Sequence, residues 1–154
     1  MGELRPPEPP LATDRILLRP FHLDDAATVA AACQDPTIPR YTMMPDDLTE
    51  DSAREWITRG IEWWPRGVAR FAITRPPEAR CVGQIGVGFE PELKRAEAFY
   101  WLDSRVRGLG LASEALELVT RWGVRRARSR SSPSGYPRRQ RGVAASRDPL
   151  RVHP

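Results

Sequence analysis

The chain has 154 residues, of which 40% are hydrophobic and 29% are charged. This length suits one domain, and the composition is that of a globular protein without a run of about 18 apolar residues that could span a membrane. The first ten residues hold two glutamates and four prolines instead of the apolar core of a secretory signal. We therefore expect a cytoplasmic protein without a membrane partner, with a disordered segment at residues 1–10.

The charge is unevenly distributed along the chain. Residues 1–123 carry 15 basic and 19 acidic side chains, whereas residues 124–154 carry nine arginines and one aspartate. The pI of 9.7 thus describes the end of the chain and not its body. Cys33 and Cys81 lie outside any CxxC pattern and the sequence has only two histidines, so we expect neither a disulfide framework nor a metal site.

The first part of the chain predicts one strand, one helix and a loop. Residues 15–20 are short, apolar and closed by a proline, which is typical of a strand. Residues 26–32, preceded by two aspartates, predict a helix. Residues 35–47 contain three prolines and predict a loop, whose Tyr41, Met43 and Met44 either line a pocket or pack beneath the loop.

A second helix is predicted after Asp47. The sequence Asp47-Leu48-Thr49-Glu50 has the spacing of a capping box. The apolar residues that follow recur at helical spacing, and we expect them to face the core: Ala53, Trp56, Ile57, Ile61 and Trp64.

Three strands and a final helix are predicted next. Residues 69–74, 81–89 and 96–102 are strand-like, and their short connections favour an antiparallel meander. No helix follows Gly83, Gly86 and Gly88, so we interpret them as close backbone approaches within a strand and not as a phosphate loop. After residue 102 comes a glycine-containing turn and an amphipathic helix whose apolar face includes Leu111, Ala115, Leu118 and Trp122.

The turn before this helix carries the sharpest chemical signal. A helix N-terminus leaves about four backbone N–H groups unpaired and has a partial positive charge, so it binds phosphate where the chain can come close. Gly108 and Gly110 allow that approach, Ala112 keeps the third position small, and Arg107 supplies a cation. The spacing differs from a P-loop and from a dinucleotide fingerprint.

The stretch Arg107-Gly108-Leu109-Gly110-Leu111-Ala112 resembles the acyl-CoA motif of the GNAT superfamily of N-acetyltransferases: Arg or Gln, two residues, Gly, one residue, then Gly or Ala. The wider chain is similar to the branch that acetylates the N-termini of ribosomal proteins, through residues 11–20, 35–41, 82–86 and 100–102. The resemblance covers residues 11–123. It implies a mixed α/β fold of three layers (αβα) with a central, mainly antiparallel sheet.

The resemblance also implies roles for individual residues, with acetyl-CoA as co-substrate and no metal. Trp101 and Leu102 would pair with the pantetheine arm, and Val106 would wall it. An amine acceptor, either a protein N-terminus or a small molecule, would enter from the opposite side and take the acetyl group directly. The pyrophosphate would be bound by the backbone from Gly108 through Leu109, Gly110 and Leu111 to Ala112, with Arg107 and Ser113 assisting.

Two residues of the fourth strand are candidates for catalysis. The amine must be neutral to attack, so a base or a water chain must remove a proton. Glu97 is the candidate base, because the superfamily often has a strand carboxylate there; the alternative is an exposed glutamate near Lys94 and Arg95. Tyr100 is a second candidate.

The resemblance ends near Gly123. The family continues with further strands and a helix, whereas residues 124–154 hold nine Arg, five Ser and four Pro without apolar periodicity. We expect a disordered tail and a domain without its C-terminal strands, which leaves the last strand with an unpaired edge and impairs activity.

The tail has two explanations. A natural basic tail would make the chain a non-enzymatic module that binds RNA or an acidic partner. We favour a change of reading frame near Trp122–Gly123, because residues 139–153 can be written in GC-rich codons that, displaced by one base, read GNAASRRREIRSGFT, a string similar to the missing family pattern. Nucleic acid is then not expected as a partner.

Overall fold

A computed structural model of the protein describes residues 3–42 and 44–130. Its centre is a five-stranded sheet in the order β1-β2-β3-β4-β5, in which all neighbouring strands are antiparallel. The strands are β1 (Leu11–Ala12), β2 (Leu17–Arg19), β3 (Val68–Thr74), β4 (Cys81–Glu90) and β5 (Arg95–Leu102). The predicted meander of the last three strands is confirmed.

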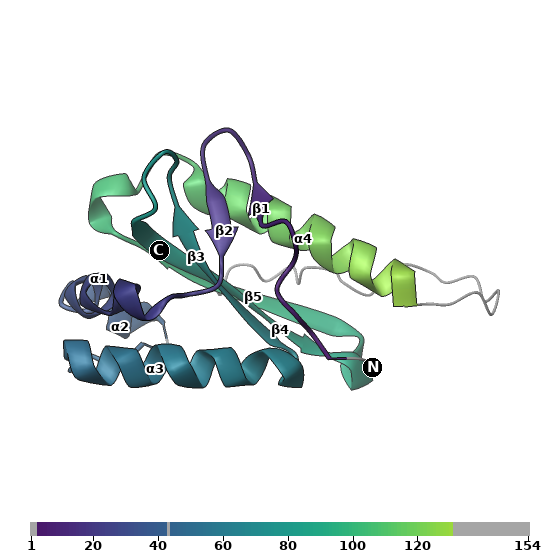
Figure 1. Ribbon diagram of the computed structural model, residues 1–154, viewed down its shortest axis with the longest axis horizontal. Helices are drawn as coiled ribbons and strands as arrows, with labels where there is room; N and C mark the ends of the chain where they lie inside the picture. Colours follow the sequence, from purple (N-terminus) through teal and green to yellow (C-terminus); the bar gives the residue numbers. More distant parts are fainter. Residues whose placement is uncertain (1–2, 43, 131–154) are drawn as a thin grey trace.

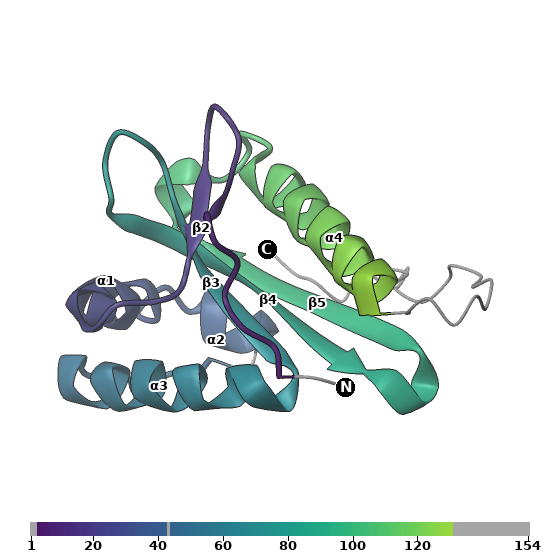
Figure 2. The ribbon, with the colours of Figure 1, turned by 45° about the vertical axis from the view of Figure 1, so that its right-hand side comes forward.

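Helices cover both faces of the sheet, which confirms the three-layer arrangement (Figures 1 and 2). One face carries α1 (Ala26–Ala32), α2 (Thr37–Tyr41) and α3 (Glu50–Trp63), and the opposite face carries α4 (Leu111–Arg130). Short 3-10 turns join these elements: η1 (Leu23–Asp25), η2 (Trp64–Arg66), η3 (Pro91–Leu93) and η4 (Ser104–Val106).

Successive side chains of a strand point to opposite faces of the sheet, so the core consists of two clusters, one on each face. In β3, Phe71 and Ile73 point to the α4 face, where Leu111 and Trp122 pack against them. On the other face, the buried residues come from the strands and from α1, α2 and α3, and include Val29, Ile38, Ile57, Ala72 and Trp101. The sheet is therefore buried on both faces, which explains why its strands are almost continuously apolar.

The segment expected to be a loop at residues 35–47 contains the short helix α2. Asp35 stabilises its first turn, because its Oδ1 accepts hydrogen bonds from the Thr37 backbone N–H at 3.0 Å and hydroxyl at 2.7 Å. Tyr41 is 47% exposed, whereas Met44 is buried, and Met43 lies outside the described residues.

Helix α3 begins two residues later than the predicted capping box. Thr49, and not Asp47, is the N-cap: its hydroxyl accepts from the Ser52 N–H at 3.1 Å and the Ser52 hydroxyl accepts from the Thr49 N–H at 2.8 Å. Of the predicted stripe, Ala53, Ile57 and Trp64 are buried, while Ile61 is 49% exposed.

Two boundaries also differ from the sequence analysis. Leu4 is buried in the α4-side cluster and therefore packs against the domain, whereas the sequence analysis expected a disordered segment at residues 1–10. Helix α4 continues past Gly123 to Arg130, because one glycine in a helix costs about 1 kcal/mol but does not by itself end the helix. The remainder of the arginine-rich segment, residues 131–154, lies outside the described residues.

Within residues 3–42 and 44–130, no helix is both long and apolar enough to cross a membrane. The same residues hold no group of three or more side chains placed to bind a metal ion.

Candidate functional site

The glycine turn lies between the end of β5 and the start of α4. Gly108 and Gly110 both have φ of +81°, a conformation that strains any residue with a Cβ. A Cβ at Gly108 would have no atom within 4 Å, so the backbone here is open to an approaching group. In the described part of the chain, the N–H groups of Gly108, Leu109 and Gly110 donate no hydrogen bond. The turn and the first turn of α4 thus present a run of unused donors.

Arg15 supports this turn from the hairpin between β1 and β2. Its Nη2 donates to the Leu109 carbonyl at 2.6 Å, and its Nε donates to Glu114 Oε2 at 2.7 Å. The Thr13 hydroxyl donates to the other Glu114 oxygen at 2.7 Å. The Thr13 hydroxyl and then Arg15 lower the pKa of Glu114, so the first turn of α4 carries an ionised, fully partnered carboxylate. The sequence analysis missed Arg15, because no spacing relates residue 15 to residue 109.

Arg107 was expected to assist in phosphate binding, and it is already engaged on both sides of its guanidinium. Its Nε donates to the Leu102 carbonyl at 3.0 Å, and its Nη2 donates to Asp35 Oδ2 at 3.1 Å. The hydroxyl and N–H of Thr37, followed by Arg107, lower the pKa of Asp35. Arg107 therefore ties the turn to the end of β5 and to the start of α2.

The other predicted residues of the turn divide into anchors and accessible groups. Trp101, Leu102, Val106 and Leu111 are buried. Ala112 is half-buried and Ser113 is exposed in the first turn of α4, next to the exposed backbone of residues 108–110. The buried side chains thus fix the position of the turn. The groups that a ligand can reach include backbone atoms, the Ser113 side chain and the Leu109 side chain, which is 44% exposed.

The two candidate catalytic residues leave β5 on opposite faces. Glu97 is exposed and lies opposite Gly88 in the register, on the face that also carries Trp101. Arg95, its expected neighbour, is paired with Glu90 at 2.6 Å. Tyr100 packs against the α4-side cluster, and burial raises the pKa of its hydroxyl. The structure does not bring these two side chains together at one point.

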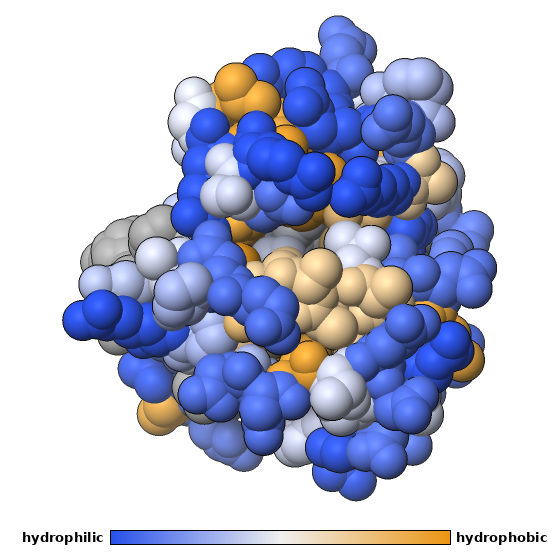
Figure 3. Space-filling model, turned by 90° about the vertical axis from the view of Figure 1, so that its left-hand side faces the viewer, coloured by the Kyte–Doolittle hydropathy of each residue, from blue (hydrophilic) through white to orange (hydrophobic). Residues whose placement is uncertain are grey.

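A hollow of about 230 Å³ with a mixed polar and apolar lining lies beside the Arg107–Asp35 pair. Three segments form its wall: one end of α1, the loop that precedes β4, and the turn η4. Arg80, Asp103 and Arg105 are among the lining residues. Figure 3 views the molecule from this side and shows a depression with hydrophobic residues on its floor and hydrophilic residues around it.

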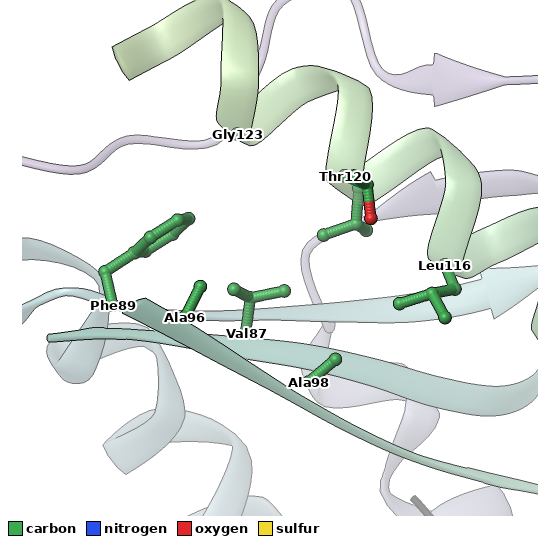
Figure 4. A pocket seen from close by; sticks show the side chains of 8 residues that line it. Val87, Phe89, Ala96, Ala98, Leu116, Thr120 and Gly123 are labelled. Atoms are coloured by element: carbon green, nitrogen blue, oxygen red, sulfur yellow. The ribbon is translucent and has the colours of Figure 1, made fainter. Parts of the chain in front are cut away.

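A second, apolar recess of about 20 Å³ lies between α4 and the strands β4 and β5. Phe89, Val87 and Ala98 approach it from the sheet, and Leu116 and Thr120 from the helix (Figure 4). Strand β5 borders this recess and, among the described strands, pairs only with β4. The free edge expected for the last strand is therefore present in the described part of the chain.

A profile of the acetyltransferase (GNAT) domain family matches residues 15–141, which is most of the chain. The chain belongs to this family. The match continues beyond Gly123, where the sequence analysis placed the end of the resemblance. A comparison with curated protein sequences gave no significant match.

Solved structures share the acetyltransferase fold. A protein assigned as a ribosomal-protein-serine acetyltransferase from Vibrio cholerae has a TM-score of 0.68 at 20% identity, over 80% of this chain and 71% of its own. An acetyltransferase from Salmonella typhimurium that modifies the N-terminal serine of ribosomal protein L7/L12 has a TM-score of 0.61 at 18% identity, over 74% and 66%.

The microcin C7 self-immunity acetyltransferase, solved in complex with acetyl-CoA and AMP, has a TM-score of 0.60 at 16% identity, over 71% of this chain and 63% of its own. The chain thus spans about two thirds of the length of these structures. At such identities the likeness shows a common fold.

Proposed function

We propose that this acetyltransferase domain moves an acetyl group from acetyl-CoA to a primary amine, and that the backbone of residues 108–113 binds the CoA pyrophosphate. One observation carries the proposal. Two glycines with φ of +81° turn the chain from the end of an edge strand into the N-terminus of a long helix, with their N–H groups unused. A diphosphate is the kind of group that such a run of donors binds.

The electrostatics of the turn support the same ligand. Arg15 is the closest cation to Gly110, because its Nη2 would lie 3.5 Å from a Cβ placed there, and its side chain is 45% exposed. Arg15 can therefore contact a bound phosphate without leaving Glu114. Arg107 donates from Nε to the Leu102 carbonyl and from Nη2 to Asp35, so it serves in this proposal first as a positioning residue, with its remaining donors able to assist a bound phosphate.

The transfer itself requires two proton movements. The amine nitrogen forms a bond to the acetyl carbonyl carbon while the carbon–sulfur bond breaks, the amine gives up a proton, and the sulfur gains one. Glu97, exposed on the α3 face, is proposed to accept the proton of the amine. Tyr100, on the α4 face and with a raised pKa that keeps it protonated, is proposed to donate to the sulfur.

The acceptor is proposed to be a protein N-terminus or a small primary amine. The Salmonella typhimurium protein of similar fold modifies an N-terminal serine, which supports a protein N-terminus as one member of this class. The acceptor would approach β5 from the face that carries Glu97.

The first test substitutes Gly108 by alanine and uses Gly67 as the matched control. Both glycines have positive φ, +81° and +97°, so alanine strains both by about 1–2 kcal/mol, but Gly67 lies at the end of η2, away from the turn. Calorimetric titration of the full chain should show that G108A lowers the affinity for acetyl-CoA at least tenfold, whereas G67A leaves it unchanged. Equal affinities in the two variants would place the pyrophosphate elsewhere.

A further inference from the structure

The outer edge of β5 pairs with no other strand in the described part of the chain. The Asp103 N–H donates to the Val82 carbonyl at 2.9 Å, which shows how the backbone groups are directed at this end of the strand. Because these groups alternate along a strand, every even-numbered residue of β5 directs its N–H and C=O groups away from β4. The Leu102 carbonyl agrees with this direction, since it accepts a hydrogen bond from Arg107 Nε at 3.0 Å.

This edge lacks the features that usually keep an edge strand from pairing. Edge strands are commonly protected by charged side chains, by proline or by a bulge. Residues 98–102 contain no charge and no proline, and the register of β5 with β4 is unbroken. The charges lie at the two ends, with Arg95 and Glu97 at the start and Asp103 immediately after the strand. The middle of the edge is therefore open to pairing with another strand.

Residues 131–154 of the same chain have a composition that does not favour a strand along this edge. Their longest stretch without proline is 138–148, which contains four arginines and a single β-branched residue, Val143. Strands are enriched in β-branched and aromatic residues, which fit a pleated, half-buried surface. The composition thus favours an occupant from another molecule.

A second copy of β5 fits the edge when the two strands run antiparallel around a twofold axis at Phe99. Ala98 then lies opposite Tyr100 of the partner subunit, and Ala96 lies opposite Leu102 of the partner subunit. All these residues direct their backbone groups to the edge, so each pair exchanges two hydrogen bonds, and symmetry repeats both pairs.

The side chains of β5 leave room for this pairing. On the α4 face, both pairs place a small alanine opposite a large side chain, and Ala96 and Ala98 border the apolar recess in Figure 4. On the other face, the Phe99 ring lies over Gly86, so it leans towards β4 and away from the axis.

The charges at the ends of β5 favour this register over its neighbours. With the axis at Phe99, Arg95 lies opposite Asp103 of the partner subunit at both ends of the pairing. An axis one residue earlier leaves Arg95 opposite no charge. An axis at Glu97 places the two Glu97 carboxylates opposite each other, and an axis at Tyr100 places Glu97 opposite Asp103 of the partner subunit. Like charges directly opposite each other destabilise a strand pair.

We propose that β5 pairs with β5 of a second copy of this chain around a twofold axis at Phe99, which gives a homodimer with one continuous sheet. Asp103 keeps its ion pair with Arg105, at 2.8 Å, because a carboxylate accepts several hydrogen bonds. The same edge is the one on which the pantetheine arm is expected at Trp101 and Leu102. The dimer and bound acetyl-CoA therefore exclude each other, and the monomer is the form that binds the co-substrate.

Analytical ultracentrifugation of the full chain measures the dimer directly. Between about 1 and about 500 µM, the average mass should rise from 17.4 kDa towards twice that value, because a small interface of this kind gives a weak, reversible complex. Saturating acetyl-CoA should shift the same samples towards the monomer.

The variant Ala98→Pro tests which surface forms the dimer. Proline removes an N–H that faces the edge and that β4 does not use, so the variant should keep its fold. Ala98→Ser is the matched control, because it retains this N–H. A98P should raise the dissociation constant of the dimer at least about tenfold, since symmetry removes two hydrogen bonds, whereas A98S should leave it nearly unchanged.

Engineered cysteines test the register. Opposite residues that are not hydrogen-bonded to each other lie about 4.5 Å apart between their Cα atoms, which a disulfide can span, so Phe99→Cys should form a disulfide-linked dimer under mild oxidation. Glu97→Cys is the control, because its two copies would lie more than about 13 Å apart, beyond the reach of a disulfide. Cys33 and Cys81 are both buried, so the parent chain should give no linked dimer.

Three results would overturn the proposal: a monomer over the whole concentration range, as residues 131–154 covering the edge would produce; a dimer that A98P leaves intact; or a disulfide in E97C but not in folded F99C. If F99C does not fold, the comparison of A98P with A98S still decides. A dimer that persists with acetyl-CoA bound would contradict the exclusion. A chain that forms the dimer but never binds acetyl-CoA would contradict the proposed function alone.

Discussion

The buried pair Arg19–Asp25 offers the sharpest stability prediction. Arg19 Nη1 and Nη2 donate to the two Asp25 oxygens at 2.8 and 2.9 Å, and their side chains are only 13% and 7% exposed. The same guanidinium donates to the Pro20 carbonyl at 3.0 Å and to the Ala79 carbonyl at 2.8 Å. It therefore joins the end of β2, the turn before α1 and the loop before β4.

Replacing Asp25 by asparagine keeps the shape of the side chain and removes its charge. Breaking a buried pair by changing one partner costs about 3–5 kcal/mol, and the two carbonyls that Arg19 retains place the expected loss near about 3 kcal/mol. Since 1 kcal/mol changes the Tm by about 2–4 °C for a chain of this size, D25N should unfold about 6–12 °C below the parent.

The assay is urea unfolding followed by tryptophan fluorescence, together with a thermal scan of each variant. Glu117→Gln is the matched control, because Glu117 pairs with Arg121 at 2.9 Å on the surface of α4, with side chains 64% and 62% exposed. Such an exposed pair contributes only about 0.3–0.5 kcal/mol. A loss in D25N no greater than that in E117Q would refute the reasoning from burial.

Two further predictions concern the strand β4 and the turn η4. Gly83→Ala should destabilise the fold by at least about 2 kcal/mol in the same urea assay, because its Cβ would lie 2.5 Å from the Trp101 carbonyl oxygen, whereas Gly88→Ala, with no atom within 4 Å, should leave the free energy of unfolding nearly unchanged. Equal effects at the two glycines would contradict the close approach. For Asp103, the Arg105 side chain is the main cause that lowers the pKa from 3.8 to about 2. Because the folded state depresses this pKa, its contribution to stability is complete above about pH 4 and is lost as the pH falls towards 2. NMR should show a carboxyl midpoint near 2, and the variant D103N should lack this part of the pH dependence. A midpoint near 3.8 would contradict the Arg105 pairing.

The sequence predicted the elements with strong periodicity and failed where single contacts decide the outcome. The strands β3, β4 and β5 were predicted to within one residue, because the pattern of apolar residues extends over many positions. Helix α2 was missed because three prolines predict a loop. Asp35 supplies the hydrogen bonds to Thr37 that begin the helix, which no composition reveals.

The candidate site divides in the same way. The glycine turn is a local pattern, so the sequence located it, and the structure shows both glycines with positive φ. Arg15 reaches the turn across 94 positions of the chain, and such a contact has no signature in spacing. Gly88 was interpreted with Gly83 and Gly86 as a close approach, which is correct for the other two and wrong for Gly88.

The charges around the turn explain why net charge is a poor guide to the ligand of this chain. Arg15, Arg105 and Arg107 each form an ion pair, with Glu114, Asp103 and Asp35. These pairs largely cancel, so the positive potential at the turn comes chiefly from the unpaired N–H groups and the N-terminus of α4. In the proposed function, an acidic body therefore binds a dianion at one point, and the arginines of residues 124–154, which set the pI, are not needed for it.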